Sequence, residues 1–191
     1  MKPIYVPPGQ FNPGANANEL AQTMQILLAL PWLEMTEARK EYFMFDGEPI
    51  QYTYGGAANG RTYTSVKFEP VVKNIMEYIN EVYNKNYNVC FLNRYDSSKN
   101  QLGWHADDSP EMNMEHDIAV VSFGAAREIW WKDKMYKGEI PAENRQLLES
   151  GSLFVMPAGF QRDHYHRIPK SDRECGTRIS LTFRNYLKQE K

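Results

Sequence analysis

The chain has 191 residues, of which 42% are hydrophobic and 24% are charged, a size and composition that suit one domain and exclude a fully disordered chain. Its 22 basic and 24 acidic residues leave a formal net charge of −2. That balance argues against a strongly basic protein that coats nucleic acid, although it allows a local basic groove.

Residues 1–17 contain four prolines and two glycines, which predict an extended N-terminal arm without regular structure. We expect residues 18–191 to form the single domain. Its first helix begins near Asn18 and is stopped by Pro31. A second helix begins at Pro70, and Val72 and Ile79 belong to its apolar face.

From Asn88 onward, short runs of β-branched and aromatic residues alternate with turn residues. The expected strands are 89–95, 118–123, 128–132, 153–156 and 177–183. Strands at this spacing predict an antiparallel sandwich or barrel. With the two preceding helices packed on one face, the expected class is mostly β with supporting helices (α+β).

The two cysteines, Cys90 and Cys175, are too few and too far apart for a disulfide framework, which favours a reducing compartment. The N-terminus lacks the apolar core of a signal peptide, and the longest apolar stretch, at 26–30, is too short to span a bilayer. We therefore expect a cytoplasmic protein with no membrane partner, acting as a monomer.

His105 and Asp107 form an HxD element, and in an extended segment both side chains point to the same face. A distant histidine would complete a 2-His-1-carboxylate triad, the arrangement of non-haem Fe(II) oxygenases, which leaves three metal positions open. HxD also occurs by chance. Alternatively, the pair His164 and His166 would belong to a zinc site, although no cysteine lies nearby to serve as a further ligand.

The strand at 178–184 alternates apolar and polar residues, and its polar face begins with Arg178 and ends with Arg184. Two arginines on an inward face require an anion, and their Cα atoms are about 20 Å apart in an extended strand. A short dicarboxylate would fit between guanidiniums that reach toward each other. An edge strand whose arginines face water is the alternative. Asn93 and Tyr95 end another strand with groups able to bond a carboxylate, although Tyr95 also suits a core.

In this order, NRY at 93–95, HxD at 105–107, SFG at 122–124, His166 and RISLTFR at 178–184 resemble the AlkB family of Fe(II)/2-oxoglutarate-dependent dioxygenases. The resemblance covers about 51–187. It implies a double-stranded β-helix (jelly-roll) core that uses Fe(II), 2-oxoglutarate and O₂. Ser180 departs from the asparagine of many relatives, so one cosubstrate hydrogen bond is expected to be missing or mediated by water.

The resemblance also implies residue roles. The metal ligands and catalytic residues are His105, Asp107 and His166, with His166 favoured over His164. Arg178 would pair with the remote carboxylate of 2-oxoglutarate, in a pocket also lined by Asn93, Tyr95, Thr182 and Arg184. The substrate base would meet Tyr52, Tyr54, Trp104 and Asp108, provided that these side chains converge.

The activity implied is oxidative demethylation of N-alkylated bases, such as N1-methyladenine and N3-methylcytosine, in DNA or RNA, with release of formaldehyde and succinate. The expected partner is methylated, single-stranded nucleic acid, because the target atom is buried in a duplex. A basic cluster of Arg162, Arg167, Lys170 and Arg173 either contacts phosphates or is a solvated loop. Two alternatives stay open: the same chemistry on a protein side chain, small molecule or deliberately modified base, and a binding module without catalysis.

Overall fold

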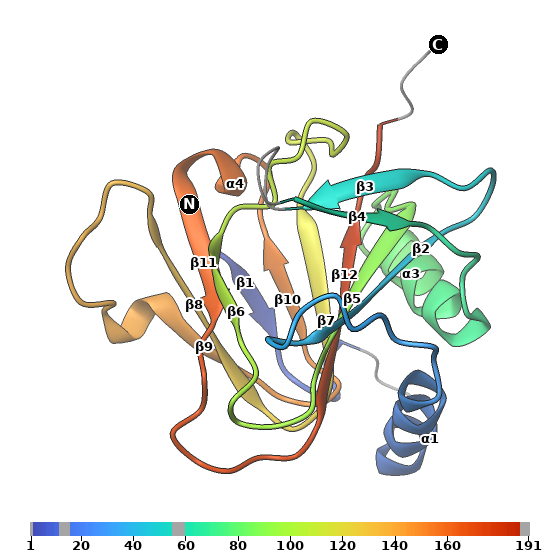
Figure 1. Ribbon diagram of the computed structural model, residues 1–191, viewed down its shortest axis with the longest axis horizontal. Helices are drawn as coiled ribbons and strands as arrows, with labels where there is room; N and C mark the ends of the chain where they lie inside the picture. The colour runs from blue at the N-terminus through green and yellow to red at the C-terminus, as the bar shows by residue number, and fades with distance from the viewer. Residues whose placement is uncertain (1, 12–15, 55–59, 188–191) are drawn as a thin grey trace.

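The computed structural model of the protein describes residues 2–11, 16–54 and 60–187. Its core is built on a six-stranded antiparallel sheet (Figure 1). Its strands, in spatial order, are β1 (Ile4–Val6), β10 (Leu153–Met156), β7 (Ile118–Gly124), β12 (Arg178–Arg184), β5 (Val89–Tyr95) and β2 (Lys40–Phe45). The strand β12 lies between β5 and β7, and all seven of its residues are buried. One face of this central strand meets the helices and the other faces the sandwich interior.

A four-stranded antiparallel sheet closes the sandwich on the interior side. It consists of β6 (Leu102–His105), β11 (His164–Ile168), β8 (Arg127–Asp133) and β9 (Arg145–Leu148). The short helices α4 (Phe160–Asp163) and η1 (Ala142–Asn144) lie in the connections. Apolar side chains from both sheets, including Val120, Ile129 and Ile168, form one core cluster between them. The expected mostly β jelly-roll architecture is confirmed.

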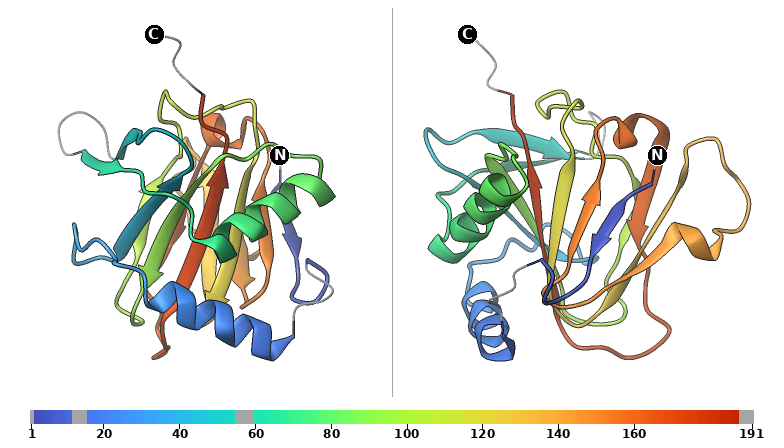
Figure 2. Two further views of the ribbon diagram at one scale, coloured as in Figure 1. Left: turned by 90° about the vertical axis from the view of Figure 1, so that its right-hand side faces the viewer. Right: turned by 180° about the vertical axis from the view of Figure 1, so that it is seen from behind.

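Two helices, α1 (Ala17–Leu28) and α3 (Pro70–Val82), cover the outer face of the larger sheet (Figure 2). Asn16 caps the N-terminus of the first helix: its side chain accepts hydrogen bonds from the backbone N–H groups of Asn18 and Glu19 and forms a capping box with Glu19. In the second, Val72 and Ile79 are buried against the sheet, as the apolar periodicity predicts.

A separate hairpin of β3 (Gln51–Tyr54) and β4 (Arg61–Thr64) lies beside β2. Its Tyr52 and Tyr63 are buried and pack on Phe43 and Phe91. Because these aromatic contacts join the hairpin to β2 and β5, they fix its position relative to the sandwich.

The irregular arm expected over 1–17 is wrong at Ile4–Val6, which forms β1 and pairs with β10 at the edge of the larger sheet. These three residues have high β-propensity, which favours the pairing. The prolines on either side are tolerated because β1 is an edge strand. Ala17 already belongs to α1. The rest of the arm at 1 and 12–15 lies outside the described residues. Within the described part of the chain, no helix is both long and apolar enough to cross a membrane.

Candidate metal and cosubstrate site

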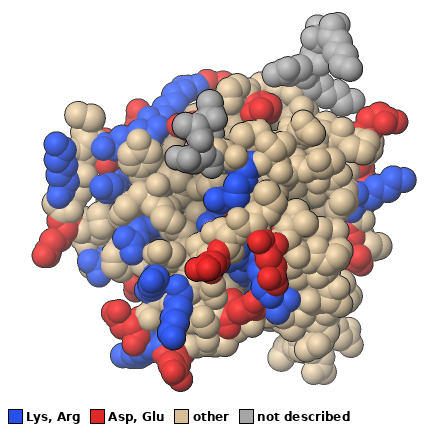
Figure 3. All heavy atoms as spheres, in the orientation of Figure 1, with Lys and Arg blue, Asp and Glu red and all other residues tan. Residues whose placement is uncertain are grey.

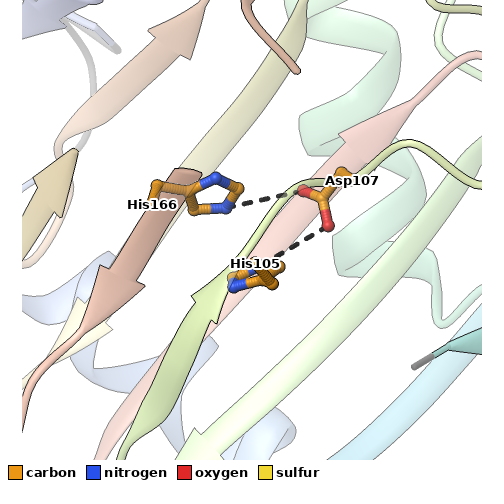
Figure 4. Close-up of side chains that lie close together, drawn as sticks. All are labelled: His105, Asp107 and His166. Atoms are coloured by element: carbon orange, nitrogen blue, oxygen red, sulfur yellow. Dashed lines mark ion pairs between the residues drawn. The ribbon is translucent and has the colours of Figure 1, made fainter. Parts of the chain in front are cut away.

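His105, Asp107 and His166 lie together inside the sandwich (Figure 4). The strands β6 and β11 pair His105 directly with His166, and the two ring centroids are 4.1 Å apart. Asp107 follows β6 and turns its carboxylate toward both rings, with its oxygens 3.6 Å from His105 Nε2 and 3.7 Å from His166 Nε2. One ligand atom from each residue lies within 4.8 Å of the others, so a single ion can contact all three.

Backbone contacts orient this group. The carbonyl oxygen of Gly103 lies 2.8 Å from His105 Nδ1 and can only accept a hydrogen bond, so Nδ1 carries the proton and the lone pair of Nε2 points toward Asp107. The backbone N–H of Asp107 donates to Gln161 Oε1 over 3.0 Å. Gln161 is buried at the start of α4, and nothing in its local sequence indicates this contact.

The electrostatic environment keeps the three ligands in their metal-binding protonation states. Burial lowers the pKa of His105, and burial together with the neighbouring His105 lowers the pKa of His166 to about 3, so both imidazoles are neutral. Burial alone would raise the pKa of Asp107, but Arg184 and smaller contributions from His166, His105 and Arg39 together outweigh it, and the pKa lies below its usual value. Two neutral imidazoles and one carboxylate fit Fe(II).

The five residues assigned to the cosubstrate all line the pocket that contains these ligands. They are Asn93, Tyr95, Arg178, Thr182 and Arg184. They come from the adjacent strands β5 and β12, whose register pairs Arg178 with Tyr95. Alternation along both strands therefore turns one set of side chains toward the ion site and the other toward the helices.

Arg178 is the most informative of these residues. Its side chain is only 1% exposed, and its Nη2 donates to Ser122 Oγ over 3.0 Å. Its Nε and Nη1 have no hydrogen-bond partner among the described residues, and burial lowers its pKa to about 10. A buried guanidinium with two open donors beside a metal site fits a carboxylate ligand such as the remote end of 2-oxoglutarate.

The alternative that the two arginines of β12 face water is wrong, and both line the same pocket. Both are buried, and Arg184 turns to the metal end, where its Nη2 lies 2.8 Å from Asp107 Oδ1. Its Nη1 donates to Tyr52 Oη over 3.0 Å. The pocket for the dicarboxylate therefore has two open donor atoms on Arg178. The guanidinium of Arg184 is held beside the metal carboxylate, and only its Nε lacks a partner among the described residues.

The four residues expected around the base do not all converge. The ring of Tyr54 lies edge-on to His105 at 5.6 Å, and the exposed Asp108 lies 3.3 Å from Lys134 Nζ. Tyr52 is 1% exposed and lies inside the aromatic core. Trp104 points to the opposite face of β6, because it directly precedes the inward-facing His105. Its assignment to the base pocket is wrong.

Two further residues that the sequence did not indicate support the pocket. Arg39 Nε donates to Asn93 Oδ1 over 2.8 Å and also pairs with Glu41, which is 0% exposed. Glu41 in turn accepts a hydrogen bond from Tyr63 of β4. The hairpin that carries Tyr54 is thus connected to the cosubstrate pocket through two buried charges.

Comparison with known proteins agrees with this geometry. Residues 19–184 match the model of the 2OG-Fe(II) oxygenase superfamily. The DNA oxidative demethylase ALKBH2 of Mus musculus is 33% identical over 150 residues, which cover 74% of this chain and 63% of that protein. The chain belongs to the AlkB family of this superfamily. Membership implies Fe(II), 2-oxoglutarate and O₂ as its cofactor and cosubstrates.

Other AlkB-family proteins give the same picture. ALKBH2 of Homo sapiens is 31% identical, with 74% of this chain and 58% of that protein covered. The alpha-ketoglutarate-dependent dioxygenase alkB homolog 3 of Homo sapiens is 29% identical, with coverages of 84% and 59%. The chain therefore spans about three fifths of the length of these relatives. The solved structure of OsALKBH1 matches 96% of this chain and 97% of its own, with a TM-score of 0.62 and 13% identity, which shows the shared fold.

Proposed function

We propose that this protein is a 2-oxoglutarate-dependent dioxygenase that removes methyl groups from N-alkylated bases of DNA or RNA. The observation that carries the proposal is the close group of His105, Asp107 and His166 beside the open guanidinium of Arg178. Relatives named as DNA oxidative demethylases support the choice of substrate class. The products would be formaldehyde, succinate, CO₂ and the unmethylated base.

Each residue then has a distinct task. His105, Asp107 and His166 would hold the iron, which together with 2-oxoglutarate and O₂ supplies the oxidation of the N-methyl carbon. Arg178 would grip the remote carboxylate of the cosubstrate. Asn93, Tyr95, Thr182 and Arg184 would complete the wall of this pocket. The surrounding apolar core keeps bulk water away from the reacting atoms.

The ring of Tyr54 lies beside His105, and Asp108 directly follows Asp107 in the chain. These two residues are therefore the best-placed groups for the base. An aromatic face and a carboxylate suit the cationic bases N1-methyladenine and N3-methylcytosine. Both lesions weaken Watson–Crick pairing, which eases extrusion of the base, and we propose single-stranded nucleic acid as the preferred partner.

We further propose that residues 18–191 form one oxygenase domain that acts as a monomer in the cytoplasm. The family match over 19–184 supports a single oxygenase unit. The free thiols of Cys90 and Cys175 support a reducing compartment.

The test begins with anaerobic reconstitution of the protein with Fe(II) and 2-oxoglutarate. The loaded protein is then exposed to O₂ in the presence of methylated DNA and RNA oligonucleotides. Mass spectrometry should detect loss of one methyl group, with stoichiometric formaldehyde and succinate. His166→Ala should abolish turnover, whereas His164→Ala, two residues away on β11 and stacked on Phe160, should keep it. Activity confined to peptides or small molecules would refute the proposed substrate, and an active His166→Ala variant would refute the ligand set.

A further inference from the structure

A row of alternating aromatic and cationic side chains crosses the outer face of the four-stranded sheet. From β6 to β9 it consists of Trp104, Arg167, Trp130 and Arg145, one from each strand. The strand register pairs Arg167 with Trp130 and Trp130 with Arg145. The guanidinium carbon of Arg167 lies 5.4 Å from the ring centroid of Trp104 and 5.0 Å from that of Trp130, and Arg145 lies 4.5 Å from Trp130. We call these four residues the outer row.

Lysines connect the outer row to the mouth of the active site. Lys132 Nζ lies 4.9 Å from the ring centroid of Trp104. Lys134 Nζ lies 5.1 Å from the ring centroid of Tyr165 and 3.3 Å from Asp108 Oδ2. The strand register pairs Tyr165 with Lys132. Cations therefore follow one another from Asp108, directly after the metal carboxylate, to the far edge of the sheet.

The charges of this face are not neutralised within the described chain. Lys132, Arg145 and Arg167 take part in none of the ion pairs between described residues. Arg167 Nε is buried and has no hydrogen-bond partner there. The nearby Glu128 accepts from Trp130 Nε1 over 2.7 Å instead of pairing with a cation. Arg145 Nε and Nη2 donate to the carbonyl oxygen of Ile140, which leaves its Nη1 for an external anion. Stacking on tryptophan thus helps to hold the cations in place, and donors of both arginines stay open to an external anion.

The middle of the outer row borders a cleft of about 720 Å³. Arg167 and Trp130 form part of its wall, and Lys170 and Arg173 add two further cations from the loop after β11. The carboxylates that line it are Glu128 and Asp172. Figure 3 shows basic side chains gathered on the left half of the molecule, over the four-stranded sheet.

Resting on the proposed function, we propose that this face binds the phosphate backbone of the nucleic-acid strand whose base enters the active site. Cations two strands apart are separated by about 10 Å, which suits a chain of regularly spaced charges better than one small anion. Guanidinium planes held on tryptophan also offer stacking surfaces to unpaired bases. The strand would run from the mouth at Asp108 across the outer row, with the cleft beside its middle.

The first test is binding of an unmodified, fluorescein-labelled single-stranded DNA of about 15 nucleotides, followed by anisotropy over a salt series. Arg145→Gln/Arg167→Gln should weaken binding at least about tenfold at low salt. Its slope of log K against log[salt] should become shallower by about 1.4, since each phosphate contact on a single strand contributes about 0.7. The control Lys2→Gln/Lys67→Gln removes the same charge from exposed positions outside this face and should keep the wild-type slope. Equal binding by the two double variants would overturn the proposal.

A second variant tests the aromatic part of the row. Trp130→Leu keeps every charge but removes the ring that holds Arg145 and Arg167 in place. Affinity should fall severalfold while the salt slope stays near its wild-type value, because the number of phosphate contacts is unchanged. Wild-type affinity in this variant would show that the row does not act as a unit and would count against the proposal.

Other outcomes separate this surface from the proposed activity. If a methylated oligonucleotide is demethylated but Arg145→Gln/Arg167→Gln binds like the control, the surface fails and the proposed function stands. If this variant binds more weakly but wild-type enzyme demethylates no oligonucleotide, the surface stands and the proposed function fails. Poly-glutamate of matched charge should compete poorly. Competition equal to that of unlabelled DNA would overturn the assignment to nucleic acid.

Discussion

Arg184 lies 2.8 Å from Asp107, so the last residue of β12 neutralises the carboxylate of the metal-binding group. Asp107 is only 2% exposed, and an isolated carboxylate at that depth would be strongly disfavoured. The ion pair keeps the carboxylate ionised, and the bond from Arg184 to Tyr52 fixes the direction of the guanidinium. The site therefore depends on a contact between β12 of the larger sheet and the segment that follows β6 of the smaller sheet.

We predict that Arg184→Gln destabilises the fold and weakens metal binding. Breaking a buried ion pair typically costs about 3–5 kcal/mol, and loss of a partner that orients a metal ligand typically lowers metal affinity about 10–100-fold. Thermal unfolding and Co(II) titration measure the two effects. Arg184→Lys, which keeps the charge but not the forked geometry, should be intermediate in both. Unaltered Co(II) affinity in Arg184→Gln would contradict this role.

Arg178 should show opposite effects on stability and on cosubstrate binding. Arg178→Met removes a buried charge with two open donors, so the protein without cosubstrate should be as stable as wild type or more stable. The same change should weaken 2-oxoglutarate binding by about 2–3 kcal/mol, or roughly 30–150-fold, because a charged hydrogen-bonded contact is lost. Thermal unfolding with and without 2-oxoglutarate measures both. If 2-oxoglutarate stabilised Arg178→Met as much as wild type, the assignment would be wrong.

Gln161 should act on the metal only through Asp107. Gln161→Met keeps the volume but removes the acceptor for the backbone N–H of Asp107. We expect Co(II) affinity to fall about tenfold, as is typical when a residue supporting a metal ligand is lost. Arg162→Met is the matched control, because this neighbour on α4 is exposed and pairs with Glu115. Equal Co(II) affinities in the two variants would exclude the supporting role.

The motifs of the sequence predicted the metal-binding group because its geometry follows from local rules. An extended HxD places His105 and Asp107 on one side, and alternation along β12 turns Arg178 and Thr182 toward the same interior. The five strands predicted from 88 onward are present, with ends shifted by at most one residue.

The contacts that the sequence did not predict depend on how distant elements pack. The contacts of Arg184 and of Gln161 with Asp107 join residues that are far apart in the chain. No sequence periodicity indicates which of such distant residues meet. The pair of Arg39 and Glu41 looks like ordinary surface charge in sequence, although it is buried beneath the β3–β4 hairpin. The aromatic character of Trp104 suggests a place beside the base, but strand alternation turns its side chain away from the inward-facing His105.

Far from the metal site, His116 and Asp117 should make stability depend on pH. His116 Nδ1 lies 3.1 Å from Asp117 Oδ1, and this contact raises the pKa of His116 above its usual 6.5. Burial acts to raise the pKa of Asp117, but hydrogen bonds from His116, Lys85 and Tyr87 outweigh it, and the pKa falls below 3.8. The histidine contribution is complete below pH 6.5 and is lost as the pH rises through the folded-state pKa. The aspartate contribution is complete above pH 3.8 and is lost as the pH falls through its own.

Asp117→Asn should therefore reduce the free energy of unfolding most between about pH 4 and 6.5, where both contributions are present. At pH 9 the reduction should be smaller but not zero, because Lys85 and Tyr87 still bond the wild-type carboxylate, at 2.7 and 2.6 Å. Urea unfolding of both proteins at pH 5 and pH 9 measures the difference. In a His116→Asn background the change between these two pH values should disappear, since no histidine is left to titrate. A loss on Asp117→Asn that is equal at pH 5 and pH 9 with His116 present would show that the pair does not titrate on unfolding.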